Sequence, residues 1–277
     1  MKITIIEAPA AFICRDAYWN QLAEYLDTQA SDVLVLNELP FGPWVSSREN
    51  YHEIDFEQSM RLHKEALESF DELGVETVVG SLPFLVNGKG INRSFVWRRE
   101  YASLEFVHDK QFIPSHKGYH EARWFQPGST KFGVSTIGEF RCAFLICTDV
   151  MFNEWARFYG RCGVDIIFVP RATNITTIDR WKSALSMAAI VSGAYVASSN
   201  RSGANDAGGS FGGSGMLFSP RGELVAETSH DEPMLSVSVD LSATRKAKED
   251  YPCNVPDLVS QTFFQQFIQK EKNYDDT

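Results

Sequence analysis

The chain has 277 residues, of which 44% are hydrophobic and 13% aromatic, so it can bury a substantial core in one large domain or two small ones. Its formal net charge at pH 7 is −10, which provides no general positive field for nucleic acid or an anionic membrane surface. Apolar runs such as residues 3–6 and 33–36 are too short to span a bilayer. No nucleic-acid or membrane partner is expected.

The five cysteines lie at positions 14, 142, 147, 162 and 253, and an odd number scattered over a long chain does not indicate a disulfide scaffold. No Cys-x-x-Cys pair occurs, and the six histidines have no zinc-ligand spacing with the cysteines, so no metal site is expected. The first residues contain no apolar run of signal-peptide length. A cytoplasmic location is the expectation.

The first third of the chain alternates strand and helix patterns, as in an α/β domain with helices packed on a sheet. In the longest predicted helix, apolar residues recur at helical spacing, Asp55 is placed to cap the start and Gly74 to end it. The predicted elements are strands over residues 2–7, 32–36 and 75–81 and helices over residues 16–28 and 55–73.

The second half of the chain repeats this alternation after a predicted hairpin region between residues 91 and 106. Strands are predicted over residues 141–146, 164–169, 195–199, 216–218, 224–227 and 235–239, and helices over residues 153–161 and 179–192. The Gly- and Ser-rich stretch 203–215 predicts a flexible loop, and residues 257–269 a terminal helix or arm. No linker-like change in composition occurs, so residues 1–277 are expected to form a single domain.

Three candidate catalytic residues follow extended segments. Cys147 ends the apolar strand predicted over residues 141–146, and α/β folds place reactive groups at the carboxyl ends of strands. By position alone, packing as a small hydrophobic residue is the more common role of such a cysteine. Glu38, at the end of another buried strand, either caps a turn or acts as a partly desolvated general base with a raised pKa. Lys110 alone would be a solvated loop lysine beside Asp109.

Taken together, these strings resemble the nitrilase superfamily of carbon–nitrogen hydrolases, in the same order and over most of the chain. LNELP at residues 36–40 resembles the strand that ends in the family's first catalytic glutamate. Lys110, with GYHE at 118–121 and FQPG at 125–128, resembles the catalytic-lysine motif and its accessory glutamate, Glu121. ICTD at 146–149 resembles the nucleophile elbow, and SNR at 199–201 and PRGE at 220–223 resemble later core strings.

The resemblance implies a reaction that needs no metal or organic cofactor. Glu38 would accept the proton of Cys147 as the thiol attacks an amide carbon, because a neutral thiol is a poor nucleophile near pH 7. Lys110 and the backbone N–H of Thr148 would stabilise the developing oxyanion. Glu121 would hold Lys110 charged and oriented. A thioester would form, and water would release the acid.

The residues beside the nucleophile bear on the substrate. Thr148 and Asn153 depart from the residues that the family often has at these positions, Tyr, Trp or Asn at the first and Pro at the second. Val150 and Met151 offer no arginine clamp for a substrate carboxylate, which favours neutral or cationic amides over N-carbamoyl amino acids. Arg171 follows a buried strand, and it either reaches the substrate in place of such a clamp or is a surface arginine.

The family resemblance further implies a four-layer αββα sandwich that forms a homodimer or larger homo-oligomer, with residues 253–277 as a possible oligomerisation arm. The favoured function is hydrolysis of a small linear amide. A nitrilase and an N-carbamoyl amide hydrolase are the alternatives, and a non-catalytic binding protein is disfavoured because Glu38, Lys110, Glu121 and Cys147 are all retained. A papain-like arrangement is disfavoured because no His motif accompanies the cysteine.

Overall fold

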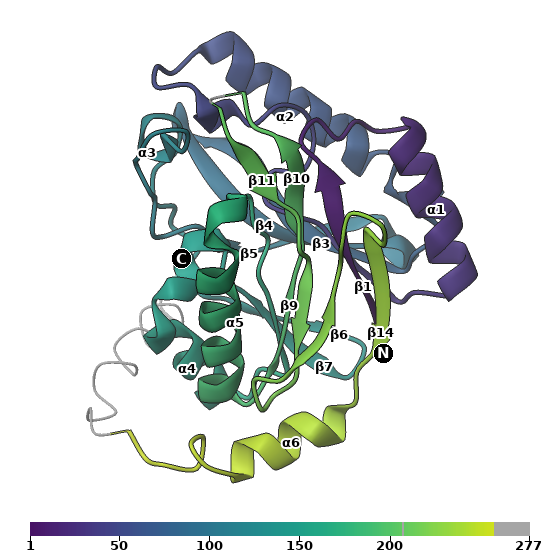
Figure 1. Cartoon of the computed structure of the whole chain (residues 1–277), viewed down its shortest axis with the longest axis vertical. Helices are drawn as coiled ribbons and strands as arrows, with labels where there is room; N and C mark the ends of the chain where they lie inside the picture. Colours follow the sequence, from purple (N-terminus) through teal and green to yellow (C-terminus); the bar gives the residue numbers. More distant parts are fainter. Residues whose placement is uncertain (207, 258–277) are drawn as a thin grey trace, which may run out of the picture.

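The structure, a computed structural model that describes residues 1–206 and 208–257, contains two β-sheets flanked by helices (Figure 1). The larger sheet has eight strands in the order β11-β10-β1-β2-β3-β4-β5, with β14 paired to β1. These strands are β1 (Lys2–Pro9), β2 (Val33–Val35), β3 (Thr77–Val86), β4 (Lys89–Arg98), β5 (Ser103–Asp109), β10 (Asn200–Ala204), β11 (Ser210–Gly212) and β14 (Met234–Ser238).

The smaller sheet has six strands in the order β13-β12-β9-β8-β7-β6. They are β6 (Val134–Ile137), β7 (Phe140–Phe144), β8 (Ile166–Phe168), β9 (Tyr195–Ser198), β12 (Met216–Phe218) and β13 (Leu224–Glu227). The pairs β7–β8 and β8–β9 are parallel, as are β1–β2 and β2–β3 in the larger sheet. Parallel neighbours place the carboxyl ends of successive strands at one edge, which is where α/β folds build their sites.

The α-helices described by the structure lie on the outer faces of the sheets or in their connections (Figure 1). They are α1 (Ala17–Gln29), α2 (Glu53–Leu67), α3 (Glu121–Trp124), α4 (Asn153–Arg161), α5 (Ile178–Ser192) and α6 (Leu241–Glu249). Within this described part, no helix is long and apolar enough to cross a membrane.

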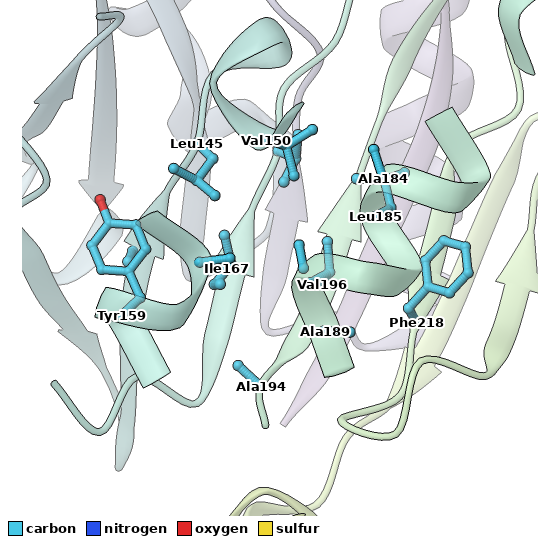
Figure 2. Close-up of a cluster of buried hydrophobic side chains, with 14 of the residues drawn as sticks. Leu145, Val150, Tyr159, Ile167, Ala184, Leu185, Ala189, Ala194, Val196 and Phe218 are labelled. Carbon is cyan, nitrogen blue, oxygen red and sulfur yellow. The ribbon is translucent and has the colours of Figure 1, made fainter. Parts of the chain in front are cut away.

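Three layers of buried apolar side chains show how the elements stack. One cluster packs α1 and residues 66–75 against the larger sheet, through residues such as Trp19, Leu22 and Phe70. A second lies between the two sheets, with Ile5 and Phe144 among its members. The third packs the smaller sheet against α4 and α5, and Figure 2 shows its central side chains. The order is therefore helices, sheet, sheet, helices, and the predicted αββα sandwich is confirmed.

The long helix expected over residues 55–73 differs in the structure. Helix α2 begins at Glu53, two residues before Asp55, and ends at Leu67. Asp55 does not cap it; the carboxylate forms an ion pair with Arg48 instead. A separate 3-10 turn covers the remaining residues to Leu73, and Gly74 ends it with a φ of 74°, as its position predicted.

Part of the stretch 203–215, expected to be a flexible loop, lies in strands, namely Gly203 and Ala204 in β10 and residues 210–212 in β11. Strand β10 continues the sheet beside β1 and pairs with β11 through Ser202, Gly203 and Ala204. A Cβ at Gly213 would lie 2.4 Å from the carboxylate of Glu7, so this glycine permits close packing. Within this stretch the strand pairing is between β10 and β11, whose cross-strand hydrogen bonds override the local preference of Gly and Ser for loops.

The proposed oligomerisation arm and the predicted terminal helix lie mainly outside the described residues. The described part ends near α4, where Arg157 and Arg161 contact the Asp257 carboxylate at 2.5 and 2.8 Å. Homo-oligomerisation and the single-domain assignment for the whole of residues 1–277 stay predictions.

Candidate active site

The predicted site residues meet where strands of both sheets end. Glu38 follows β2, Lys110 follows β5, and Cys147 follows β7 and opens a 3-10 turn, η4 (Cys147–Met151). The segment after β8 joins the two sheets here. Its Arg171 carbonyl accepts from the Glu38 backbone N–H at 3.1 Å, and its Pro170 carbonyl accepts from that of Cys147 at 2.9 Å. The carboxyl ends of parallel strands thus bring distant motifs together.

Lys110 lies between two carboxylates. Its Nζ donates to Glu38 Oε1 at 2.7 Å and to Glu121 Oε2 at 2.5 Å. All three side chains are buried. Glu121 reaches this position because it opens helix α3, whose preceding loop returns from β5. A buried ammonium is held in its charged form by such partners, so Lys110 carries a fixed positive charge inside the protein.

The two oxygens of Glu38 differ. Oε1 accepts from Lys110 and also from Asn92 Nδ2 at 2.8 Å, whereas Oε2 is buried and has no hydrogen-bond partner within the described residues. A buried carboxylate oxygen without a partner is costly, and such exceptions call for a specific explanation. Oε2 is the oxygen of Glu38 that remains available to accept a proton. Asn92, which fixes the orientation of the carboxylate, had no signal in the sequence motifs.

Cys147 occupies a strained backbone position. Its φ is +48°, in the left-handed region that non-glycine residues rarely adopt. The side chain is 4% exposed. Burial and the Glu38 carboxylate raise the pKa of the thiol well above its usual range, while Lys110 and the Ala172 backbone N–H act in the opposite direction. The resting thiol is therefore neutral, and it needs a base to become a nucleophile.

The charges of Lys110, Glu38 and Glu121 depend on one another. Burial disfavours the Lys110 ammonium, but Glu121 and Glu38 outweigh this effect and raise its pKa well above the usual value. Burial raises the pKa of Glu121 to about 8, although Lys110 partly opposes that shift. These values belong to a coupled cluster in which a proton added to one carboxyl changes the affinity of the others.

A second buried network, formed by His108 and Asp149, contacts the backbone segments next to Lys110 and Cys147. Asp149 Oδ1 accepts from the backbone N–H groups of Gln111 and Phe112 at 3.2 and 2.9 Å. Its Oδ2 accepts from Ile146 N at 3.1 Å and pairs with His108 Nε2 at 2.9 Å. Asp149 thus joins the residues after Lys110 to the residue before Cys147. The nucleophile motif includes Asp149, but no motif indicated its partner His108.

The two residues predicted to bind substrate have different environments. Thr148 is partly exposed in η4. Arg171 is fully buried, so the surface-arginine alternative is wrong. Its guanidinium donates to Ser198 Oγ and to the Ser214 carbonyl, each at 2.6 Å. Burial lowers its pKa to about 10, while the charges of Cys147 and two more distant carboxylates partly oppose the shift. Arg171 remains charged near neutral pH.

Within residues 1–206 and 208–257, no group of three or more His, Cys, Asp or Glu side chains could hold a metal ion. The buried charges of the site are instead supplied by Lys110 and its carboxylate partners.

Comparisons with known proteins identify the family of the chain. The profile of the carbon–nitrogen hydrolase family matches residues 11–249. The chain is similar to the 2-oxoglutaramate amidase of Bacillus subtilis (strain 168), 25% identical over 230 residues, 82% of this chain and 85% of that relative. It is also similar to an omega-amidase of Xenopus tropicalis, 26% identical over 187 residues, 65% of this chain and 67% of the relative.

Solved structures share the fold. The carbon–nitrogen hydrolase from Helicobacter pylori G27 superposes with a TM-score of 0.82 at 21% identity, covering 97% of this chain and 98% of that one. A variant of the amidase from Nesterenkonia sp. AN1, which shows Michael addition of acrylamide at its active site cysteine, gives a TM-score of 0.73 at 18% identity, covering 92% and 98%. By the family profile, which spans most of its length, this chain belongs to the carbon–nitrogen hydrolase family.

Proposed function

We propose that the protein is an amidase that hydrolyses a small linear amide through a thioester on Cys147. The observation that carries this proposal is the buried group of Glu38, Lys110 and Glu121 around a neutral, strained cysteine. Glu38 uses Oε1 for Lys110 and Asn92 and keeps Oε2 without a partner. A base oriented in this way, next to a thiol that must lose its proton, is the arrangement that nucleophilic catalysis by cysteine requires.

In the acylation half of the proposed reaction, Glu38 Oε2 takes the proton of Cys147 as the sulfur attacks the amide carbon. The carbonyl oxygen becomes an oxyanion, which Lys110 and the backbone N–H of Thr148 stabilise; each such donor contributes about 3 kcal/mol in comparable sites. Glu38 then gives its proton to the leaving nitrogen. The C–N bond breaks, ammonia or an amine departs, and the acyl group stays on sulfur.

In the deacylation half, Glu38 takes a proton from water as the oxygen attacks the thioester carbon. The tetrahedral intermediate collapses, the C–S bond breaks, and the thiolate recovers a proton from Glu38 while the carboxylic acid leaves. Glu121 stays on Lys110 throughout and maintains its charge and position. The sum is one amide and one water converted to one acid and one amine, with no redox change.

The relatives support an amide substrate over a nitrile. The similar proteins from Bacillus subtilis and Xenopus tropicalis are named 2-oxoglutaramate amidase and omega-amidase, and both names describe hydrolysis of an amide. We therefore place a linear primary amide first among the substrate classes. N-carbamoyl compounds and nitriles are the classes against which it is to be compared.

The proposal is tested by measuring ammonia release from a panel of linear amides, N-carbamoyl compounds and nitriles, with intact-protein mass spectrometry to detect the acyl-enzyme. Amides should be cleaved with the highest kcat/KM, and a mass increase equal to the acyl group should appear on wild-type protein. Cys147→Ala should show neither signal, whereas the matched Cys14→Ala variant should show both. Ammonia release from nitriles without release from amides would refute the amidase assignment.

A further inference from the structure

Three buried polar groups beside the proposed active site have unused hydrogen-bond donors in the part of the chain that the structure describes. They are Trp44 Nε1, Ser46 Oγ and the Tyr119 hydroxyl, whose proton has no acceptor there. The two segments that carry them are joined, because the His120 backbone N–H donates to the Ser46 carbonyl at 2.8 Å. Unsatisfied buried polar groups are rare in native proteins, and several in one place call for an explanation such as ligand binding.

The rings of Trp44, Tyr119 and Phe211 form one cluster, here called the aromatic cluster. Trp44 lies 6.2 Å from Tyr119 and 6.3 Å from Phe211, measured between ring centroids, and Tyr119 lies 6.4 Å from Phe211. Trp44 is 3% exposed. Aromatic groups with a polar end combine apolar contact area with a directed hydrogen bond, which is how small-molecule sites obtain orientation.

The aromatic cluster lies close to the reacting groups. Ala172, whose backbone N–H acts on the Cys147 sulfur, packs in the same hydrophobic cluster as Trp44 and Phe211. The Tyr119 phenol lies close enough to Cys147 for their charges to interact, and also interacts with Glu38 and Glu121. Burial first, then these charges, raise the pKa of Tyr119, while a hydrogen bond that the phenol oxygen accepts from the Asn205 side chain partly opposes the shift. The phenol is therefore protonated and able to donate.

The charge around the aromatic cluster selects the kind of ligand. The Arg201 guanidinium lies 5.5 Å from the Trp44 ring centroid and 5.9 Å from that of Phe211. Arg201 is fully buried, and its hydrogen bonds in the described structure go to backbone carbonyls, including that of Gly42 at 3.0 Å. A positive charge held in this way disfavours an ammonium group nearby. Indole N–H is a donor only, so the matching ligand atom is an acceptor.

We propose that Trp44 Nε1 and the Tyr119 hydroxyl bind a hydrogen-bond acceptor, a carbonyl or carboxylate oxygen, at the acyl end of the substrate. This inference rests on the proposed amidase function, since it assigns the part of the amide that does not react. It differs from the preference for neutral or cationic amides expected from the sequence, which considered only the residues after Cys147. The donors come from the segments after β2 and β5 instead.

Binding to the Cys147→Ala protein, measured by calorimetry, tests this assignment without turnover. The probes are four linear five-carbon amides that differ only at the far end: pentanamide, 5-aminopentanamide, pentanediamide and glutaramate. Pentanediamide and glutaramate, which carry an oxygen at the far end, should bind about tenfold more tightly than pentanamide. This is the change expected for one or two good hydrogen bonds. The 5-amino compound should bind most weakly. Comparison of glutaramate with pentanediamide distinguishes a carboxylate from an uncharged carbonyl.

Tyr119→Phe and Trp44→Phe are each combined with Cys147→Ala. Each should remove most of the roughly tenfold preference for glutaramate and pentanediamide over pentanamide. Tyr119→Phe removes one hydroxyl oxygen and should leave Tm nearly unchanged, whereas Trp44→Phe also leaves a cavity in a buried cluster and should lower Tm. Trp124→Phe is the matched control: Trp124 packs in the same hydrophobic cluster, but its Nε1 already donates to the Arg48 carbonyl at 2.9 Å. That variant should lower Tm and retain the preference. Exposed Tyr101→Phe should change neither property.

Equal binding of all four amides, or an unchanged preference in both Tyr119→Phe and Trp44→Phe, would overturn the assignment. A loss of affinity by the same factor for every amide would also overturn it, since a donor to the far end cannot affect pentanamide and glutaramate alike. If Cys147→Ala binds glutaramate and pentanediamide selectively but the wild-type protein releases no ammonia from them, the amidase function is refuted. The assignment of Trp44 and Tyr119 as donors to the far end of the ligand is then still supported.

Discussion

His108 Nε2 lies 2.9 Å from Asp149 Oδ2, and the pair is completely buried. His108 Nδ1 accepts from the Phe132 backbone N–H at 2.9 Å, so in the neutral ring the proton is on Nε2 and is donated to Asp149. The other contacts of Asp149 hold the backbone beside Lys110 and beside Cys147. Asp149 is a positioning residue that fixes the distance between the proposed nucleophile and the lysine.

Asp149→Asn should lower both stability and turnover. An Asn side chain keeps one acceptor, but its amide N–H₂ cannot accept from His108 or from the Ile146 backbone N–H. Leaving these buried donors unpaired costs about 2–4 kcal/mol of the free energy of unfolding. A displacement of Cys147 by a fraction of an ångström to one ångström should lower kcat by about 100-fold. Urea unfolding and steady-state kinetics measure the two effects.

Asp165→Asn is the control for Asp149→Asn. Asp165 is also buried, and it accepts from the Arg141 backbone N–H at 3.0 Å and the Thr244 hydroxyl at 2.7 Å, away from the proposed active site. Its loss of stability should be comparable, with kcat nearly unchanged. The positioning role is rejected if the two variants lose stability equally and keep equal kcat values, or if iodoacetamide alkylates Cys147 in Asp149→Asn as it does in wild type.

Lys110→Ala should lower kcat by about three orders of magnitude, because it removes an oxyanion donor and leaves Glu38 and Glu121 buried without their shared cation. Glu38→Gln should cause a comparable loss, since an amide cannot accept the thiol proton. The double variant should be no slower than the worse single variant, as groups that act together are not additive. Ammonia-release kinetics provides the measurement.

Lys117 offers a control for Lys110, because it is an exposed lysine on the same connection between β5 and α3. Lys117→Ala should retain wild-type kcat and KM. Additive losses in the Lys110→Ala, Glu38→Gln double variant would contradict a cooperative group, and near-normal kinetics in Lys110→Ala would show that another residue performs its role.

The parts of this site that follow from the sequence are those encoded in short strings. Glu38 and Cys147 each lie shortly after the end of an apolar strand, β2 and β7, so their position at a sheet edge depends on residues close in sequence. The pairing of His108 with Asp149 joins residues 41 positions apart and has no local signal. Composition likewise predicts a loop for residues 203–215, but Gly203 and Ala204 pair with Phe211 and Ser210 across β10 and β11, which Gly and Ser content alone does not indicate.

Of the five cysteines, Cys147 alone should be essential for turnover. Cys142 is fully buried within β7, where burial raises its pKa far above the usual value, so it stays a neutral packing group. Cys142→Ala should cost about 1–2 kcal/mol of the free energy of unfolding and leave kcat intact. Cys147→Ala should fold and lose activity. Chemical denaturation and ammonia release of the five single variants decide this, and a folded, active Cys147→Ala protein would disprove the thioester mechanism.

His63 should make the protein sensitive to acid. The ring is buried, its Nδ1–H donates to the Ser59 carbonyl at 2.7 Å, and its Nε2 accepts from the Phe41 backbone N–H at 3.4 Å. Burial lowers the pKa of His63 from 6.5 to about 3, and the nearby Arg201 also lowers it. Because the unfolded chain binds this proton more tightly, the contribution of His63 to stability is present above pH 6.5 and is lost as pH falls toward 3.

Each pH unit within that window should remove about 1.4 kcal/mol from the free energy of unfolding. His63→Gln, which does not titrate there, should be less stable than wild type at pH 7 and lose stability less steeply between pH 6.5 and 5. His52→Gln, at an exposed position just before α2, should retain the wild-type slope. Urea titrations at several pH values compare the three proteins. Parallel curves for wild type and His63→Gln would mean that His63 is already protonated in the folded state, or that it has the same pKa in both states.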